Sequence, residues 1–183
     1  MKPAKNKACK VCGDTFQPFQ TTQKVCGPKC AIDYAKSQAL AKWEKLERAK
    51  HKADLERIKT RAQWLREAQQ AFNAFVRERD KDLPCISCQR HHAGQYHAGH
   101  YKSVGGNPEL RFCEDNNHKQ CAPCNNHLSG NIVNYRPNLI EKIGQTLVDW
   151  LEGPHAQIKL SIEDIRAIKA TYKAKLKELK NNS

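Results

Sequence analysis

Apolar residues recur every three or four positions along two stretches of the chain, which is the spacing of a helix that buries one face. The longer stripe comprises Leu55, Ile58, Ala62, Leu65, Gln69, Phe72 and Val76. A shorter stripe comprises Ile32, Ala35, Ala39, Trp43 and Leu46. The stripes do not share a helical register, and the polar run 47–54 separates them. The pattern predicts that 32–82 is a long basic helical segment that bends or divides within 47–54.

The longer stripe has two interpretations. It resembles the seam along which one helix packs against another. In the first interpretation the partner helix belongs to the same chain, and the basic face of the segment is solvated. In the second, residues 55–76 form the interface of a homodimer. The sequence leaves both interpretations open.

The C-terminal segment 135–183 reads as two helices separated by Gly153-Pro154. Ser161, followed three residues later by Asp164, predicts a capped helix start with an acidic first turn. The expected buried stripe of this helix comprises Ile162, Ile165, Ile168 and Tyr172. The other face carries a lysine ridge, which either faces phosphates or is simply solvated: Lys169, Lys173, Lys177 and Lys180.

Eight of the nine cysteines form two sets with metal-ligand spacing. The first set is Cys9-x2-Cys12-x13-Cys26-x3-Cys30, and the second is Cys85-x2-Cys88-x32-Cys121-x2-Cys124. Paired thiolates on two tight turns complete a tetrahedral zinc site, so the sequence predicts two structural Zn²⁺ ions. The ninth cysteine, Cys113, is expected to be a buried thiol.

These features predict an α+β protein that is mostly helical. We expect a four-cysteine zinc module at 1–31 and the long helical segment at 32–82. A zinc-stabilised core follows at 83–134, and C-terminal helices occupy 135–183.

The composition narrows the choice of partner. The formal net charge is +13, and two zinc ions, each held by four thiolates, would lower it to about +9. Nucleic acid is the common partner of such a basic protein. No apolar run approaches the roughly 20 residues of a membrane span, and the N-terminus lacks the apolar core of a signal peptide. We therefore expect a cytoplasmic protein that binds DNA and no membrane.

The stretch between the second pair of cysteine turns holds the candidate chemistry. It contains a strand-like HAGHY with His97 and His100, then Asn116, and after Cys124 the residues Asn125 and His127. This order is typical of an HNH, or ββα-metal, nuclease core. A neutral histidine suits a general base, and a divalent metal between hairpin and helix would stabilise charge on a phosphate.

The stretches HAGHY, ELRFCEDNNHKQCAPCNNH and LSGN resemble the NinG/Rap recombination endonucleases of lambdoid phages, over almost the whole chain. Residues 85–130 also resemble phage endonuclease VII. The resemblance implies a metal-dependent endonuclease that cuts Holliday junctions and D-loops in the host cytoplasm. It implies His100 as the base and a catalytic Mg²⁺ or Mn²⁺, which is held either by His97, Asn125 and His127 together or by Asn125 and His127 with more water. One departure is Gly99, because many HNH enzymes have an Asp immediately before the base.

Two other functions fit the sequence: a zinc-containing DNA-binding recombination protein that does not cut, and an HNH nicking nuclease of another specificity. Asn116 is expected to hold the hairpin loop by hydrogen bonds and thereby to orient His100. Among the flanking residues, His91 and His92 are expected at the surface and His118 in a loop. Tyr101 and Phe112 should pack the hairpin. The candidate phosphate contacts are Lys102, Arg111 and Lys119.

Overall fold

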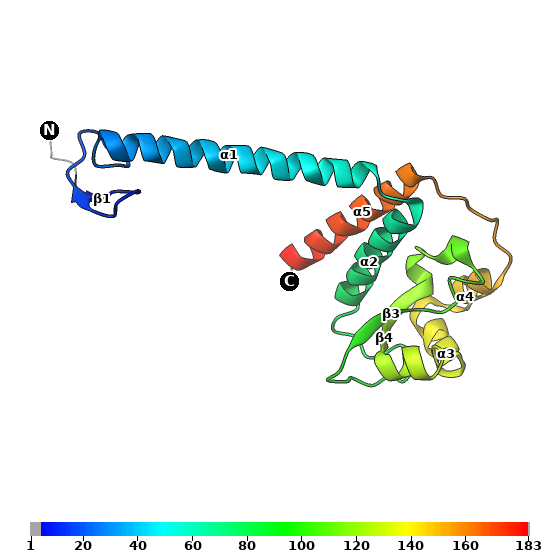
Figure 1. Ribbon diagram of the computed structural model, residues 1–183. Helices are drawn as coiled ribbons and strands as arrows, with labels where there is room; N and C mark the ends of the chain where they lie inside the picture. The colour runs from blue at the N-terminus through cyan, green and yellow to red at the C-terminus, as the bar shows by residue number, and fades with distance from the viewer. Residues whose placement is uncertain (1–4, 183) are drawn as a thin grey trace. The chain divides into compact units, whose positions relative to one another are not determined.

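A computed structural model describes residues 5–182, and the chain divides into two compact units, residues 1–59 and 60–183 (Figure 1). Each unit contains one two-stranded antiparallel sheet, and helices make up most of both. The predicted α+β class is therefore confirmed. The second half of 32–82 belongs to the second unit, because it packs against two later strands and the last helix of the chain. Within the described residues, no helix is long and apolar enough to cross a membrane.

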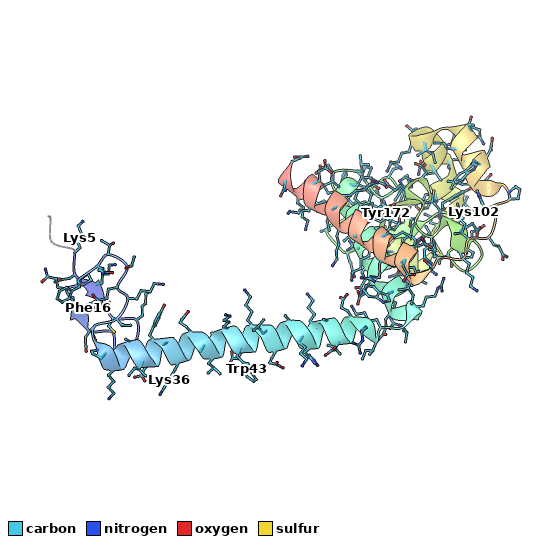
Figure 2. All side chains as sticks on the ribbon, turned by 90° about the horizontal axis from the view of Figure 1, so that it is seen from above. Lys5, Phe16, Lys36, Trp43, Lys102 and Tyr172 are labelled. Carbon is cyan, nitrogen blue, oxygen red and sulfur yellow. The ribbon has the colours of Figure 1, made fainter. Side chains whose placement is uncertain are left out.

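The first unit contains β1 (Lys7–Ala8), β2 (Thr15–Phe16) and α1 (Pro28–Arg57). None of the residues of α1 is buried, and Trp43, whose side chain projects from the helix in Figure 2, is 60% exposed. The helix continues unbroken through 47–54, so the predicted division there is wrong. The break lies at Ile58–Thr60, where Thr60 and Gln63 form a capping box that starts the next helix.

The second unit is built around α2 (Arg61–Arg79) and α5 (Ile162–Asn181), which lie side by side (Figure 1). Phe72 is fully buried between them, with its ring centroid 4.6 Å from Tyr172 and 5.7 Å from Phe112. Val76 is buried in the same cluster. The intramolecular interpretation of the 55–76 stripe is confirmed at these positions, so Phe72 and Val76 are not free to form a dimer seam. The predicted cap of α5 by Ser161 and Asp164 is also confirmed.

A hairpin of β3 (Tyr96–His100) and β4 (Asn117–Cys121) forms the centre of this unit. The strands are antiparallel, and His97 pairs with Gln120 while His100 pairs with Asn117. One face of the hairpin packs on α2 through Ala98. The loop between the strands contains two short 3-10 helices, η1 (Pro108–Leu110) and η2 (Glu114–Asn116). A single π-helical turn, η3 (Pro123–His127), follows β4.

The C-terminal segment contains three helices, not two. The additional break is at Gly144, whose φ of +87° ends α3 (Ile132–Ile143) and precedes α4 (Gln145–Glu152). The predicted end at Gly153-Pro154 is confirmed, because α4 stops there. These two helices cover the other face of the hairpin with a second core cluster, whose buried members include Tyr101, Leu110, Tyr135, Leu139, Val148 and Leu151.

Candidate functional site

The first four cysteines meet in the N-terminal unit, where the sulfurs of Cys9, Cys12, Cys26 and Cys30 all lie within 4.8 Å of one another. Cys12 and Cys26 Sγ are 3.5 Å apart, and Cys26 and Cys30 Sγ are 3.6 Å apart. Sulfurs bound tetrahedrally at about 2.3 Å from zinc are separated by about 3.8 Å. The set therefore has the geometry that a zinc ion requires, and it joins the β1–β2 sheet to the first turn of α1.

The second set, Cys85, Cys88, Cys121 and Cys124, also lies within 4.8 Å, with Cys88 and Cys121 Sγ 3.9 Å apart. Cys121 ends β4 and Cys124 lies in η3, so a metal held here would fix that turn to the hairpin. Cys113 belongs to neither set. It is half-buried against the α3–α4 core, and burial raises the pKa of its thiol.

His92 lies closer to this second set than the sequence indicated. His91 is exposed as expected, but His92 is half-buried and its Nε2 is 3.2 Å from Cys88 Sγ. Burial would raise the pKa of Cys88, but the contact with His92 and hydrogen bonds from Arg90 and Cys85 together lower it to about 6. The ring therefore favours the thiolate form of Cys88, which is the form that binds a metal.

His100 stands at the end of β3, where it is half-buried. Its Nε2 is 3.2 Å from the carbonyl oxygen of Arg111. A carbonyl can only accept a hydrogen bond, so this contact assigns the proton to Nε2 and leaves a lone pair on Nδ1. Burial lowers the pKa of His100 more than the carbonyl contact raises it. The side chain is therefore neutral near pH 7 and can accept a proton.

A cavity of about 350 Å³ opens beside His100, lined by His100, Tyr101, Lys102, Ser103, Asn107, Ser129 and Ile132. The lining residues carry one imidazole, one ammonium group, one amide and three hydroxyl groups, a set able to receive a phosphate. Ser129 and the following Gly130 and Asn131 all have positive φ, between +47° and +86°. This left-handed run connects η3 to α3, and its first residue, Ser129, lines the cavity.

Asn116 has the loop-holding role expected for it. Its side chain is fully buried, and its Oδ1 accepts a hydrogen bond of 2.7 Å from the backbone of Lys102. Its Nδ2 donates to the carbonyl oxygens of Lys102 and Leu110. Its own carbonyl accepts from Tyr101 N at 2.8 Å. Asn116 thus ties together the chain on both sides of the loop and fixes the residues that follow His100.

The other predicted metal ligands are placed less closely together. Asn125 is half-buried in η3, where its Nδ2 donates to Asn126 Oδ1, and His127 is exposed. Among residues 5–182, only the two cysteine sets bring three or more Cys, His, Asp or Glu ligand atoms within metal-binding range. His97, His100 and His127 do not form a third such set. Asn125 and His127 nevertheless precede Ser129, which lines the His100 cavity.

Two predictions about β4 are wrong. His118 is not a loop residue, and Lys119 is not a phosphate contact, because both are buried in the strand. Lys119 Nζ donates to the carbonyl oxygens of Lys81 and Leu83 at 2.7 and 2.6 Å. His118 Nε2 is 3.0 Å from the carbonyl oxygen of Asp115. The sequence pattern did not indicate this burial, because the residues that surround His118 and Lys119 include the C-terminal end of α2, which is far away in the sequence.

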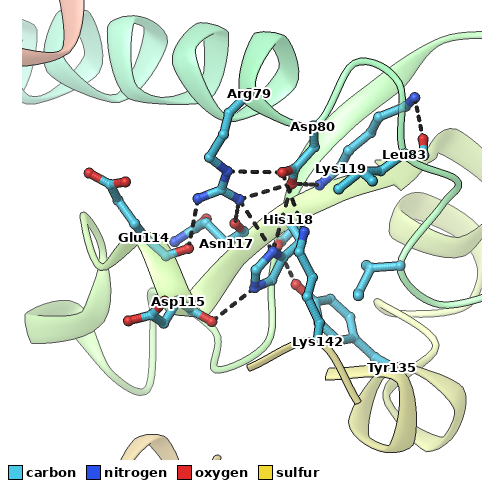
Figure 3. Close-up of polar contacts among 12 residues, drawn as sticks. Arg79, Asp80, Leu83, Glu114, Asp115, Asn117, His118, Lys119, Tyr135 and Lys142 are labelled. Carbon is cyan, nitrogen blue, oxygen red and sulfur yellow. Dashed lines mark hydrogen bonds and ion pairs between the residues drawn. The ribbon is translucent and has the colours of Figure 1, made fainter. Parts of the chain in front are cut away.

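That end supplies Arg79 and Asp80, the centre of the polar cluster in Figure 3. The Arg79 guanidinium donates twice to the Asp80 carboxylate at 2.9 Å and once to Asn117 O at 2.7 Å. Asp80 also accepts from Lys119 N, and Lys142 Nζ lies 3.3 Å away. Burial would raise the pKa of Asp80, but His118, Arg79 and Lys142 together hold it well below its usual value. The cluster fixes α2 to β4.

The other basic residues that were candidate phosphate contacts lie either near the cavity or on α5. Lys102 lines the cavity, and Arg111 is half-buried with Nη1 3.4 Å from Gln69 Oε1. On α5, Lys169 is not part of an open ridge, because it pairs with Glu67 and its Nζ lies 4.7 Å from the ring centre of Trp64. The other three ridge lysines are exposed. Tyr101 and Phe112 pack in the cores as predicted.

These features define a class of protein: a basic α+β chain in two units, each with a four-cysteine set able to hold a metal. The family model described as bacteriophage Lambda NinG protein matches residues 1–182, so the chain belongs to the NinG family. The expected family resemblance is thereby confirmed at the level of the NinG family.

Three relatives share most of their length with the chain. Protein ninG of Escherichia phage 933W is 44% identical over 195 residues, covering 99% of this chain and 96% of the relative. Protein ninG of Escherichia phage lambda is 43% identical over 197 residues, with the same coverage. Protein ninG of Salmonella phage P22 is 41% identical over 198 residues, covering 100% of this chain and 98% of the relative. No solved structure matches the chain.

Proposed function

We propose that this protein is a metal-dependent HNH endonuclease that cuts branched DNA, such as Holliday junctions and D-loops, during phage recombination. The observation that carries the proposal is the neutral, half-buried His100 beside a polar cavity that also contains Lys102. Membership in the NinG family supports a phage setting. The two four-cysteine sets would hold structural Zn²⁺, one in each unit.

His100 would act as the general base. With Nε2 directed at the Arg111 carbonyl, Nδ1 accepts the proton from the attacking water. The carbonyl contact also stabilises the imidazolium that forms, since Nε2 still donates to it. A positioned base of this kind contributes about 10²–10⁴ in rate. Asn116 keeps the adjoining loop in place and would act as a positioning residue.

A catalytic Mg²⁺ or Mn²⁺ would stabilise negative charge on the scissile phosphate and the leaving oxygen. The residues available to hold it are His97, Asn125 and His127. His97 Nε2 is buried without a hydrogen-bond partner, which fits a ligand atom awaiting a metal. Lys102, at the cavity wall, would contact the phosphate.

Preference for branched DNA would come from shape. The basic residues lie on α1, near the cavity and on α5, and phosphate contacts carry no base information. Only a junction offers several strands to separated patches at once. Two cuts also require two active sites, so a homodimer remains part of the proposal. Because Phe72 and Val76 are buried within the chain, a dimer would use other surfaces, with the exposed stripe of α1 as one candidate.

His100→Ala tests the assignment directly. The variant should lose at least about 100-fold in cleavage rate while binding four-way-junction DNA with nearly unchanged affinity, since phosphate contacts supply the affinity. Asn107→Ala, which changes another residue of the cavity wall, is the matched control and should retain most of the activity. Retained cleavage in His100→Ala would move the base elsewhere. Tight junction binding without any cleavage by the wild type would favour a DNA-binding protein that does not cut.

A further inference from the structure

Three buried side-chain atoms among the described residues lack a hydrogen-bond partner: His97 Nε2, Asn117 Oδ1 and Gln120 Oε1. A buried polar atom left unpaired costs about 1–3 kcal/mol, so a water or an ion is expected to pair with it. Two of the three belong to one cross-strand pair, because His97 on β3 faces Gln120 on β4. Directly opposed residues project from the same face of a sheet, with Cβ atoms about 5 Å apart.

The Gln120 side chain has a fixed orientation. Its Nε2 donates to Ser87 Oγ at 2.6 Å and also to the Gly130 carbonyl, an atom that only accepts. The nitrogen and oxygen of the amide are therefore assigned unambiguously. Oε1 points the other way, towards Gly99, where an added Cβ would lie only 2.2 Å from it. The amide oxygen thus occupies the space that a side chain at position 99 would need.

This arrangement accounts for the glycine immediately before His100. The φ of Gly99 is not positive, so backbone conformation does not require glycine there. Gly99 lies in a strand, where most residues fit. The close approach of Gln120 is therefore the reason that position 99 has no Cβ. Gln120 lies between Gly99 and Gly130, and the residues adjoining these glycines, His100 and Ser129, both line the cavity. Gln120 therefore contacts the chain segments that hold two of the residues lining the cavity.

We propose that Gln120 Oε1, together with His97 Nε2, binds the divalent cation of the proposed nuclease. The inference rests on that proposed function. An amide oxygen and a neutral imidazole nitrogen are both ligands that Mn²⁺ accepts, and oxygen is the preferred ligand of Mg²⁺. Many HNH enzymes have an Asp at the position of Gly99, on β3, as an oxygen ligand. Gln120, on β4, would supply the oxygen ligand in its place. Both unpaired atoms then acquire a partner.

Mn²⁺ binding provides a test that does not depend on cleavage. Full-length protein loaded with zinc at the cysteine sets is titrated with Mn²⁺, and free Mn²⁺ is measured by electron paramagnetic resonance. Gln120→Ala and His97→Ala should each weaken Mn²⁺ binding at least about tenfold. Ser87→Ala is the matched control, because it removes a partner of Gln120 Nε2 and leaves Oε1 in place. Its Mn²⁺ affinity should stay within about twofold of wild type.

A second pair of variants keeps the test decisive if Gln120→Ala folds poorly. Gly99→Asp alone should disturb the hairpin, because the new Cβ meets Gln120 Oε1 at 2.2 Å. Gly99→Asp combined with Gln120→Gly opens that space to a carboxylate, because alanine at position 120 would leave a Cβ 2.9 Å from the new one. The double variant should recover wild-type Mn²⁺ affinity or exceed it, with both zinc ions retained. A purely structural role for Gln120 predicts no such recovery.

The outcomes separate this inference from the proposed function. Unchanged Mn²⁺ affinity in folded, zinc-loaded Gln120→Ala, or failure of the double variant to bind Mn²⁺, overturns the inference and assigns a buried water to the two atoms. If the wild type still cuts junction DNA with Mn²⁺, the proposed function survives that result. Conversely, Mn²⁺ binding that depends on Gln120 in a protein that cuts no DNA would support the site and refute the nuclease.

Discussion

Asp80→Asn should be among the most destabilising single substitutions in the second unit. The Asp80 side chain is 3% exposed, and it is the carboxylate that pairs with Arg79 and Lys142 in the cluster of Figure 3. It accepts two hydrogen bonds from Arg79 at 2.9 Å and one from Lys119 N at 3.1 Å. The asparagine side chain has the same size but no charge. Its NH₂ group replaces one carboxylate oxygen and would face the N–H donors of Arg79 or Lys119.

The expected loss follows from the cations left behind. Removing one partner of a buried ion pair costs about 3–5 kcal/mol, and here Arg79 and Lys142 both lose the anion that balances their charge. For a unit of this size, that loss corresponds to a fall in Tm of roughly 10–20 °C. The measurement is urea unfolding followed by circular dichroism at pH 7 with zinc present. An unchanged m-value would show that the unfolded state is comparable.

Glu78→Gln is the matched control, since Glu78 pairs with Lys81 at 3.4 Å at the same end of α2 but near the surface. Such surface pairs contribute about 0–1 kcal/mol. If Asp80→Asn and Glu78→Gln differ by less than about 1 kcal/mol, the account of the cluster is wrong.

Three further predictions concern zinc, pH and DNA binding. Cys121→Ser should release about one zinc ion per chain by metal analysis, whereas Cys113→Ser should release none; equal zinc loss would contradict the ligand sets. Burial lowers the pKa of His118, so the unfolded state binds this proton more tightly and stability falls as pH drops below about 6.5. His118→Gln should flatten that fall between pH 7 and 5 in thermal melts, and a stability that is independent of pH in the wild type would refute the assignment. Lys102→Gln should weaken junction binding and reduce its salt dependence by about one counterion, and an unchanged slope would remove Lys102 from the phosphate contacts.

Local signals made much of the architecture predictable. The cysteine spacings correctly predicted which cysteines come together in two sets able to hold a metal, because each pair lies on a single turn. The N-terminal cap of α5 was predictable from Ser161 and Asp164 because it too is formed by residues close together in the sequence. The break at Ile58–Thr60 also had a local signal, the Thr60 and Gln63 capping box, but the mismatch between the two stripes pointed to 47–54 instead.

The side chains that are buried on each face of the β3–β4 hairpin could not be predicted from local signals. His118 and Lys119 are polar residues beside a loop, and their burial depends on Arg79 and Asp80, which lie almost 40 residues earlier. Strand alternation places His97 and Gln120 on one face only once the register between β3 and β4 is known. The candidate base His100 was recognised from its motif, whereas Gln120 carried no signal in the sequence.

Cleavage of a labelled four-way junction tests the central claim most directly. Zinc-loaded protein is incubated with the junction and with a linear duplex of matched length and sequence, with Mg²⁺ or Mn²⁺ and with a chelator of those ions. The account predicts metal-dependent cuts near the branch point, little cutting of the duplex, and no cuts by His100→Ala. Absence of cleavage under every condition, or equal cutting of junction and duplex, would contradict it.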